Sequence, residues 1–239
     1  MQEPVEVIPV PILPWGMINA FIVRQGRRAI VVDAGTPGSV KKFERALTQA
    51  GLSFADVELI VVTHAHIDHA GSAARLREIT QAPIVAHCGD MPHYCGQEAM
   101  DFCPTSLFAR LFLALGPIRD PYESFEPDIV LGASDTLDLG EYGIRGHVTP
   151  TLGHTAGSVS VLLDGGDALV GDLLASGILL GGVMFSHRAK RPPFEDDPHA
   201  VGRELQRLVG QGFERFHIGH GRTLPRAEVG RHAESLLAM

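Results

Sequence analysis

The chain has few cysteines and a deficit of basic residues. Its 3 cysteines among 239 residues are an odd number, which argues against a disulfide framework. Lys and Arg total 20 against 28 Asp and Glu, so the net charge is −8 at pH 7. Because proteins bind phosphate through clustered Lys and Arg, this balance disfavours a nucleic-acid partner. The basic piece 188–191 is short and is interpreted as a solvated loop, with contact to an anionic substrate group as the alternative.

The first residues and the longest apolar stretch predict neither a secretory leader nor a membrane span. Met1-Gln2-Glu3-Pro4 carries an acid and a proline where a secretory signal needs a basic start and an apolar stretch, so we expect cytoplasmic residence. The long apolar stretch 168–185 is interrupted by Asp172 and by four glycines. We therefore expect no membrane span there, but a core strand that ends at Asp172 and a loop that runs over the functional site.

All the cysteines fall in one segment: Cys88, Cys95 and Cys103. We expect free thiols. A structural zinc site that also uses His87, Asp90 and His93 is the alternative. The cysteines are separated by six and seven residues, however, and so lack the tight pairs that such sites use.

Histidine and aspartate are concentrated in the sequence THAHIDHAG at 63–71. Its candidate metal ligands are His64, His66, Asp68 and His69. The first two histidines follow an apolar run at 59–62, and side chains two apart on an extended chain point to the same side, so both imidazoles can bind one ion. The chain is then expected to turn, which directs the aspartate and the third histidine towards a second ion. Nitrogen and oxygen ligands without thiolate favour a divalent transition metal, with zinc as the first expectation and iron or manganese left open.

Three later candidate ligands are each preceded by glycine: His154, Asp172 and His220. Glycine suits turns in which the backbone approaches an ion closely. Each histidine taken alone is more often a core or surface residue than a ligand. The prediction of a two-metal centre therefore rests on the joint pattern of seven side chains.

The H-x-H-x-D-H spacing and the later residues resemble the metallo-β-lactamase superfamily of hydrolases through nearly the whole chain. This resemblance implies a first metal site of His64, His66 and His154. It implies a second metal site of Asp68, His69 and His220. It further implies that Asp172 bridges both ions, and that a hydroxide held between them attacks the substrate. Asp68 is the candidate catalytic residue, because it could orient that hydroxide or move its proton.

The bridging position separates the branches of the superfamily. Members that hydrolyse β-lactams characteristically lack this carboxylate, so Asp172 favours the glyoxalase-II-like, lactonase-like and phosphodiesterase-like branches. We expect no helical C-terminal extension of the kind found in longer glyoxalase-II-like members, and a short form of that group stays open. The tyrosine often found after the bridging aspartate in lactonases is absent, because Tyr142 is the last tyrosine.

We interpret the chain as a metal-dependent hydrolase that cleaves an ester, thioester or lactone of a small molecule. The alternatives are an iron-dependent persulfide-type dioxygenase and a phosphodiesterase. A β-lactamase and a non-catalytic binding module are less favoured, since a binding module has no reason to retain every ligand.

Apolar runs and turn signals alternate along the chain in the order typical of an α/β protein. Strands are predicted at 20–23, 29–32, 59–62, 84–86, 143–149, 159–163, 168–170 and 216–218, and helices at 40–50, 72–80, 198–209 and 226–237. With 45% hydrophobic residues, the 239 residues can bury one sizeable core, so a single domain is expected over 1–239. The resemblance implies a four-layer αββα sandwich of two mixed β-sheets flanked by helices.

The segment at about 88–128 is the least regular part. It carries apolar side chains at helical spacing: Leu107, Phe108, Leu111, Phe112 and Leu115. We expect a helical insertion that packs on the body or on a second subunit, so a homodimer is left open. A lid over an apolar substrate pocket is the alternative, because long irregular loops are often functional.

Residues outside the ligand set also have expected roles. Asp33 and Thr63 are candidates to fix the outer nitrogens of ligand histidines, although Asp33 could instead cap the turn at 35–38. The candidate substrate contacts are Trp15, Met17, Phe185, His187 and Arg188.

Overall fold

Two six-stranded β-sheets form the centre of the molecule, which the computed structural model describes for residues 3–178 and 184–239. The order of strands is β1-β2-β3-β4-β5-β6 in the first sheet and β14-β13-β10-β9-β8-β7 in the second. The first sheet comprises β1 (Val5–Leu13), β2 (Ile18–Gln25), β3 (Arg28–Val32), β4 (Val57–Val61), β5 (Ile84–His87) and β6 (Ile129–Leu131). The second comprises β7 (Leu137–Asp138), β8 (Gly146–Pro150), β9 (Val159–Leu163), β10 (Asp167–Leu169), β13 (Arg215–His217) and β14 (Leu224–Pro225).

Both sheets are mixed. In the first, β1, β2 and β3 are antiparallel, whereas β3, β4, β5 and β6 run parallel. In the second, β7 to β10 are antiparallel, β13 runs parallel to β10, and β14 is antiparallel to β13. A separate two-stranded ribbon pairs β11 (Ala175–Ser176) with β12 (Ala189–Lys190).

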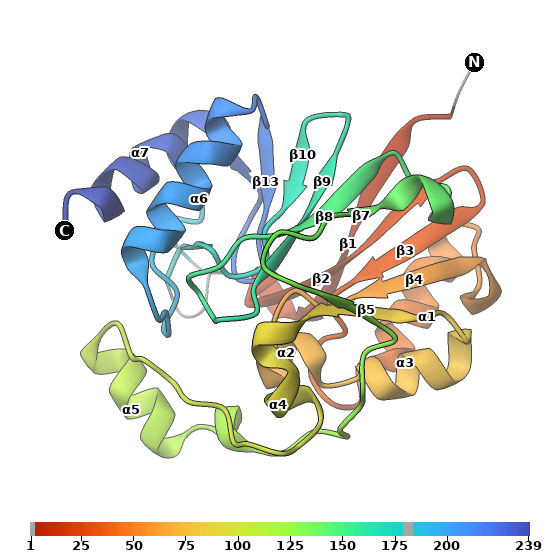
Figure 1. Cartoon of the computed structure of the whole chain (residues 1–239), viewed down its shortest axis with the longest axis horizontal. Coiled ribbons are helices and arrows are strands. Elements are labelled where there is room, and N and C mark those ends of the chain that lie inside the picture. Colours follow the sequence, from red (N-terminus) through yellow and green to blue (C-terminus); the bar gives the residue numbers. More distant parts are fainter. Residues whose placement is uncertain (1–2, 179–183) are drawn as a thin grey trace.

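Helices cover the outer faces of the two sheets. The covering helices are α1 (Val40–Gln49) and α3 (Ala73–Thr80) on the first sheet and α6 (Pro198–Gly210) and α7 (Arg226–Leu237) on the second. The other described α-helices are α2 (Ile67–Ala70), α4 (Met91–Tyr94) and α5 (Leu107–Leu115). In Figure 1, α1 and α3 lie at the lower right beside the first sheet, and α6 and α7 lie at the left beside the second. The predicted four-layer αββα arrangement of two mixed sheets flanked by helices is confirmed.

Side chains of a strand point alternately into the space between the sheets and towards the outer helices. Phe21 and Val23 of β2 pack between the sheets with Val161 of β9, whereas Ile22 between them packs against the outer helices with Phe43 of α1. Successive side chains of a strand point to opposite faces, so a strand that is apolar at consecutive positions is covered on both sides. This is why β2 to β5 are nearly continuous apolar runs.

The second sheet is covered by a helix pair with clear start signals. Helix α6 begins at Pro198, and the Asp197 side chain accepts a hydrogen bond of 2.9 Å from the Ala200 backbone N–H. Its buried residues Val201 and Leu205, spaced one helical turn apart, pack against the sheet together with residues of α7. The helix is thereby held over the strands that precede Asp172 and His220.

The longest strand was not predicted, because it contains prolines. Pro9 and Pro11 lie within β1, where a missing backbone N–H would interrupt the hydrogen bonds of a central strand. Since β1 is the outermost strand of its sheet, the prolines are tolerated there.

The long apolar stretch 168–185 contributes the end of β10, the segment around Asp172 and strand β11. Its residues 179–183, part of the expected loop over the site, lie outside the described residues. Within 3–178 and 184–239, no helix combines the length and apolar character needed to cross a bilayer.

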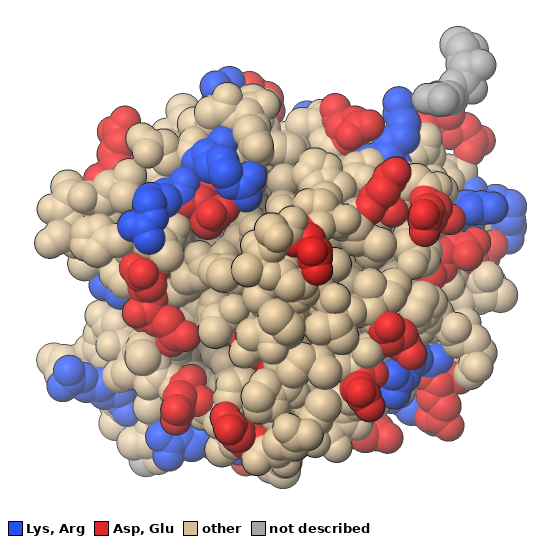
Figure 2. All heavy atoms as spheres, viewed as in Figure 1, with Lys and Arg blue, Asp and Glu red and all other residues tan. Residues whose placement is uncertain are grey.

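Acidic and basic side chains are interspersed on the face shown in Figure 2. Lys and Arg occur in small separate groups near the margins of this view, and the centre of the face is mostly uncharged. This face therefore carries no continuous basic surface of the kind that binds a phosphate backbone.

Candidate metal centre

The H-x-H-x-D-H segment changes direction at the point where its side chains diverge. His64 and His66 follow strand β4 in extended chain, and His66 has φ −63° and ψ 145°. The short helix α2, which was not predicted, begins at the next residue and contains Asp68 and His69. This change from extended chain to helix sends the two pairs of side chains in different directions, as the sequence predicted.

The three later candidates come from the ends of strands in the second sheet. His154 lies in the connection between β8 and β9, Asp172 follows β10, and His220 follows β13. All three are buried beside the segment from the first sheet. The functional side chains thus converge at one edge of the sandwich, where connecting loops are positioned by rigid strands.

Three ring nitrogens form a first cluster. His64 Nε2 lies 3.1 Å from His66 Nδ1, and His154 Nε2 lies 3.2 Å and 3.3 Å from these two atoms. Two nitrogens bound tetrahedrally to zinc at about 2.0–2.1 Å are about 3.3 Å apart. The three nitrogens therefore have the mutual spacing of ligands to one ion.

A second cluster combines nitrogens and carboxylate oxygens. His220 Nε2 lies 3.2 Å from Asp68 Oδ2 and 3.0 Å from Asp172 Oδ2, and His69 Nε2 lies 3.5 Å from Asp172 Oδ1. Asp172 Oδ2 also lies 3.9 Å from His154 Nε2 of the first cluster. The Asp172 carboxylate thus stands between the two clusters, in the position that a bridging ligand requires.

Asp33 and Thr63 contact the outer nitrogens of two of these histidines. Asp33 Oδ2 lies 2.7 Å from His69 Nδ1 and 3.0 Å from Thr63 Oγ1. Because a carboxylate only accepts, His69 donates from Nδ1, so Nε2 faces inward and holds the lone pair whenever the ring is neutral. Thr63 Oγ1 lies 3.0 Å from His64 Nδ1 and can accept from it while donating to Asp33. The Asp33 carboxylate contacts these side chains and not the turn at 35–38.

His220 is oriented in the same manner by a backbone group. Its Nδ1 donates to the carbonyl oxygen of Met17, which leaves Nε2 to face the two aspartates. Met17 was a candidate substrate contact, but the contact that the structure shows runs from its backbone to a ligand candidate.

Close packing around the clusters requires glycine. A Cβ at Gly219 would lie 2.3 Å from Asp172 Oδ1 and 2.5 Å from His69 Cε1, distances that no substitution can accommodate without displacing them. At Gly171, where φ is +52°, a Cβ would lie 2.7 Å from Thr63 Oγ1. The glycines beside the predicted ligands thus let the backbone approach the centre, for the reason that the sequence suggested.

The electrostatics divide the histidines into two kinds. Burial lowers the pKa of His66 to about 3 and that of His154 to about 4, so both rings are neutral at pH 7. Burial opposes charge on His220 as well, but Asp172 and Asp68 outweigh it and raise the pKa to about 10. The pKa of His69 is raised for the same kind of reason, with Asp33 and Asp172 overcoming burial. In the absence of a cation, these two rings carry the positive charge that balances the carboxylates.

The residues present fit a divalent metal. His69 Nε2 and Asp172 Oδ1 are buried without a hydrogen-bond partner among the described residues, an unfavourable state for polar atoms in an otherwise paired interior. The groups that could hold an ion are His64 with His66 and His154, His64 with His69 and Asp172, and Asp68 with His69 and His220. Metal ligation would satisfy the unpaired atoms, and histidine with carboxylate suits zinc, iron or manganese.

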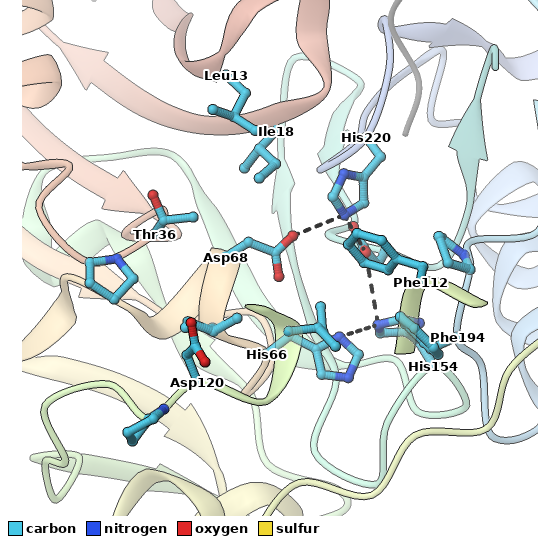
Figure 3. Close-up of a pocket in the computed structure, with 16 residues that line it drawn as sticks. Leu13, Ile18, Thr36, His66, Asp68, Phe112, Asp120, His154, Phe194 and His220 are labelled. Carbon is cyan, nitrogen blue, oxygen red and sulfur yellow. Dashed lines mark hydrogen bonds and ion pairs between the residues drawn. The ribbon is translucent and has the colours of Figure 1, made fainter. Parts of the chain in front are cut away.

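A cavity of about 530 Å³ opens onto both clusters. Figure 3 shows His66, Asp68, His154 and His220 together, with Phe112 and Phe194 beside them and Leu13, Ile18, Thr36 and Asp120 around the remaining space. His66 also stacks on Phe102, at 5.0 Å between ring centroids and 27° between planes. The site therefore combines a group of polar side chains that could hold a metal with a mostly apolar space beside it.

The other candidate substrate contacts lie elsewhere. Trp15 is 71% exposed and lines a separate depression with Gly16 and Asn19. Phe185, His187 and Arg188 are exposed and are absent from the described lining of the cavity. Their role in substrate binding stays a prediction.

Sequence reasoning missed the contribution of Asp90. It is buried, and its Oδ2 accepts hydrogen bonds of 2.9 Å from the Ala65 backbone N–H and from the Thr155 hydroxyl. It thereby joins the loop that carries His64 and His66 to the loop that carries His154. The only sequence signal was that Asp90 is an acidic residue close to His87 and His93, which suggested the structural zinc alternative.

That alternative is not supported by the structure. Cys88 and Cys103 are exposed, Cys95 is half-buried, and all are free. Among the described residues, the groups with the spacing of metal ligands contain no cysteine.

Sequence reasoning also missed part of the aromatic lining of the cavity, which Phe112 and Phe194 form. Phe194 had no sequence signal, because it lies in an irregular segment before α6. Phe112 belonged to the helical pattern at 107–115, which had a lid as one interpretation. Phe112 and Phe194 stack at 6.3 Å, so α5 does reach the cavity.

Comparison with known proteins agrees with this geometry. Residues 13–181 match the family model of the metallo-beta-lactamase superfamily. The chain is 26% identical over 205 residues to the probable metallo-hydrolase YflN of Bacillus subtilis, covering 80% of this chain and 75% of that protein. It is also 26% identical over 230 residues to a hydroxyacylglutathione hydrolase of Cupriavidus taiwanensis, covering 96% of this chain and 71% of that one.

Among solved structures, a metallo-beta-lactamase family protein from Thermus thermophilus superposes with a TM-score of 0.67. The sequence identity is 24%, and the alignment covers 98% of this chain and 78% of that chain. At this identity the likeness concerns the fold.

Proposed function

The chain belongs to the metallo-beta-lactamase superfamily, and from this we propose that it uses two divalent metal ions to cleave an ester, thioester or lactone of a small molecule. The observation that carries the proposal is the position of Asp172, whose carboxylate stands between two clusters of inward-facing ligand atoms. A carboxylate between two ligand groups supports a two-ion centre of the hydrolytic type.

We assign one ion to His64, His66 and His154 and the other to Asp68, His69 and His220, with Asp172 shared. When bound, two such ions supply an activated water near pH 7 and polarise the carbonyl oxygen of the substrate. Zinc is the expected metal, and iron and manganese fit the same donor atoms.

The protein groups around this centre supply orientation and a proton acceptor. Asp33, Thr63 and the Met17 carbonyl hold the ligand rings with their lone pairs inward. For Asp68, burial alone would raise the pKa, but His69 and His220 lower it below the ordinary value. Its carboxylate is therefore ionised at neutral pH and can accept a hydrogen bond from the attacking water. A carboxylate of lowered pKa is a weak base, so it takes up a proton only as the water attacks the substrate.

The cavity supports a small substrate that is cleaved at a carbonyl. Its described lining contains no Lys or Arg, which a phosphodiester would be expected to use. A thioester is further supported by the relatives named hydroxyacylglutathione hydrolase. Cytoplasmic residence and assembly as a homodimer stay predictions.

A panel of substrates tests this function. Protein loaded separately with zinc, manganese and iron is assayed on lactones, thioesters, aryl esters, phosphodiesters and cephalosporins, with and without a chelator. We expect at least one carboxylic ester, thioester or lactone to be hydrolysed at least about tenfold faster than the phosphodiesters and cephalosporins. The chelator should abolish this turnover. Good turnover of cephalosporins alone would show that the inference from Asp172 is wrong. Oxygen uptake with a persulfide by the iron form would favour the dioxygenase.

A further inference from the structure

We propose that the substrate has an apolar acyl chain without an anionic group, and that Asp120 selects against a negative charge at the far end of this chain and favours a positive one. The inference rests on the proposed function for the identity of the reacting bond. It adds the chemical class of the remainder of the substrate, which the metal ligands do not determine.

The walls of the cavity are apolar beyond the metal ligands. Leu13 and Ile18 from the first sheet, Phe112 of α5 and Phe194 before α6 surround the space that adjoins the clusters. A chain placed against these side chains gains affinity with each methylene that is removed from water. The space of about 530 Å³ is large enough for a small acyl compound.

The charge of the lining argues against an anionic substrate. Apart from the ligand candidates Asp68, Asp172 and His220, the one charged residue of the described lining is Asp120, and it is acidic. The residues outside the description, 1–2 and 179–183, include no Lys or Arg in the sequence. Figure 3 shows Asp120 across the cavity from His154, so a chain that starts at the metal ligands can extend towards this carboxylate.

A neighbouring depression continues this acidic character. It shares Ile67, Ile118, Asp120 and Pro121 with the cavity, and has a volume of about 540 Å³. Its charged lining comprises Glu98, Asp101 and Asp120 against Arg119, and His93 is the further titratable group. A positive end group that passes Asp120 therefore meets more carboxylates than guanidinium groups, whereas a carboxylate would meet repulsion.

This reasoning separates the chain from relatives named for a glutathione thioester. Glutathione carries carboxylates at the ends of its peptide part, and the described lining of the cavity offers no Lys or Arg to pair with them. We therefore infer that the acyl compound is neutral or cationic and that a glutathione thioester is a poor substrate.

Binding of hydroxamates tests the inference without turnover. Three ligands share a six-carbon chain and a metal-chelating hydroxamate head: hexanohydroxamate, 6-aminohexanohydroxamate and the monohydroxamate of adipic acid. Two divalent ions balance Asp33, Asp68, Asp172 and the bound hydroxamate in formal charge, so the far end of the chain senses mainly Asp120. Dissociation constants are measured by calorimetry on the zinc-loaded protein at low ionic strength.

We expect the adipic acid derivative to bind about tenfold more weakly than the neutral ligand, and the amino derivative to bind at least as tightly as the neutral one. Hexanohydroxamate should bind more tightly than acetohydroxamate by about twofold to fourfold for each added methylene. In Asp120→Asn, the difference between the anionic and the neutral ligand should shrink to about threefold or less. Asp164→Asn is the matched control, because it removes one exposed carboxylate that does not line the cavity.

Three results would overturn the inference: tightest binding of the adipic acid derivative, an unchanged difference in Asp120→Asn, or absence of binding by all three ligands. Hydrolysis of neutral esters with any of these results would leave the proposed function intact. The expected order of affinities without hydrolysis of any ester would instead support the substrate class of the cavity and contradict the proposed function.

Discussion

At the scale of single residues, Asp33 has the most consequential contacts outside the ligand set. Its Oδ2 accepts from His69 and Thr63, and its Oδ1 accepts from the Thr63 backbone N–H at 2.8 Å. It has a positive φ of 64°, a conformation that L-residues rarely adopt and that Asn and Asp tolerate best. A strained backbone held at a buried carboxylate is consistent with a role in the centre.

We predict that Asp33→Asn weakens metal binding while the fold is kept. Asn tolerates the positive φ, but it has one acceptor oxygen where Asp33 uses two. If that oxygen accepts from the Thr63 backbone N–H, the NH₂ faces His69 Nδ1–H and the ring loses its partner; if it accepts from His69, the NH₂ faces the Thr63 N–H. The affinity for the second ion should fall by about 10–100-fold. Competition with a metal chelator measures this loss, and Asp164→Asn again controls for the removed charge. Unchanged affinity for both ions would contradict the role assigned to Asp33.

Asp68 is predicted to contribute to turnover as well as to metal binding. In Asp68→Asn the side chain can still offer an oxygen ligand, but it no longer accepts a proton at neutral pH. We expect kcat to fall by at least about 10²-fold in protein whose metal content is restored by excess zinc. Metal content is measured in the same samples. Full metal occupancy with unchanged turnover would remove the proposed proton-accepting role.

Asp90 is predicted to stabilise the protein by joining two ligand-bearing loops. Asp90→Ala leaves the buried Ala65 N–H and the Thr155 hydroxyl without their acceptor, so the free energy of unfolding should fall by about 2 kcal/mol or more. Urea denaturation of the metal-free protein measures this change. Asp135→Ala is the control, because that exposed carboxylate accepts only from the Gly132 N–H, and it should cost less than about 1 kcal/mol. Equal losses in the two variants would refute this account of Asp90.

The sequence predicted which residues would converge at the centre, because a short peptide fixes the spacing of His64, His66, Asp68 and His69. The structure brings their side chains together with the later candidates, while ligation itself stays a prediction. Asp90 and Phe194 could not be predicted. Their roles depend on contacts between segments far apart in the chain, and neither belongs to a local motif.

At the scale of elements, helix α5 forms part of the wall of the cavity through Phe112. Leu107 is 82% exposed and Leu111 is 59% exposed, whereas Phe112 on the same helix lines the cavity and stacks on Phe194. The helical spacing was readable from the sequence, but the side that faces the cavity was not, because the helix is apolar at every position except Arg110. Of the two interpretations, contact with the pocket is the one that these side chains support.

We predict that Phe112→Ala reduces the affinity for an acyl chain. The apolar wall is lost next to the reacting group, so KM for a hexanoyl ester should rise by about fivefold or more, with a smaller effect for an acetyl ester. Leu111→Ala, which truncates an exposed neighbour on the same helix, should leave both KM values within about twofold. Parallel changes in the two variants would mean that α5 has no specific wall function.

Prediction of elements succeeded where periodicity was strong. The helix at 198–209 matches α6, and the strand at 159–163 matches β9. It failed for β1, whose prolines at an edge position conceal the strand, and for α2, which has only four residues. Such short or proline-containing elements depend on tertiary contacts more than on local propensity.

At the scale of the whole molecule, the metal-free protein should have a maximum of stability near pH 6.5. In the folded protein His66 and His154 have pKa values of about 3 and 4, whereas a histidine in the unfolded chain has a pKa of about 6.5. The unfolded chain therefore binds more protons, and the free energy of unfolding falls as the pH falls below 6.5. His220 has a folded pKa of about 10, so its stabilising proton is lost as the pH rises from 6.5 through 10.

The melting temperature of the metal-free protein, recorded from pH 5 to pH 9, tests this behaviour. We expect it to decline on both sides of about pH 6.5. With saturating zinc, the decline on the alkaline side should disappear, because the ions replace the protons of His220 and His69. A melting temperature that rises steadily from pH 6 to pH 9 without metal would contradict the assigned protonation states.

The α/β class was predictable from the alternation of apolar runs and turn signals, and the four-layer arrangement was predictable from the family resemblance. The order of the strands came only with the structure, since it depends on pairing between distant segments. The shape and charge of the cavity likewise depend on side chains from several elements, such as Leu13, Asp120 and Phe194.

The central claim is that two metal ions share one buried carboxylate. It is tested most directly by anomalous diffraction at the zinc absorption edge from crystals of the zinc-loaded protein. The account predicts two anomalous peaks about 3.5–4 Å apart on either side of Asp172, one among His64, His66 and His154 and the other beside Asp68, His69 and His220. A single peak, or peaks remote from Asp172, would contradict it.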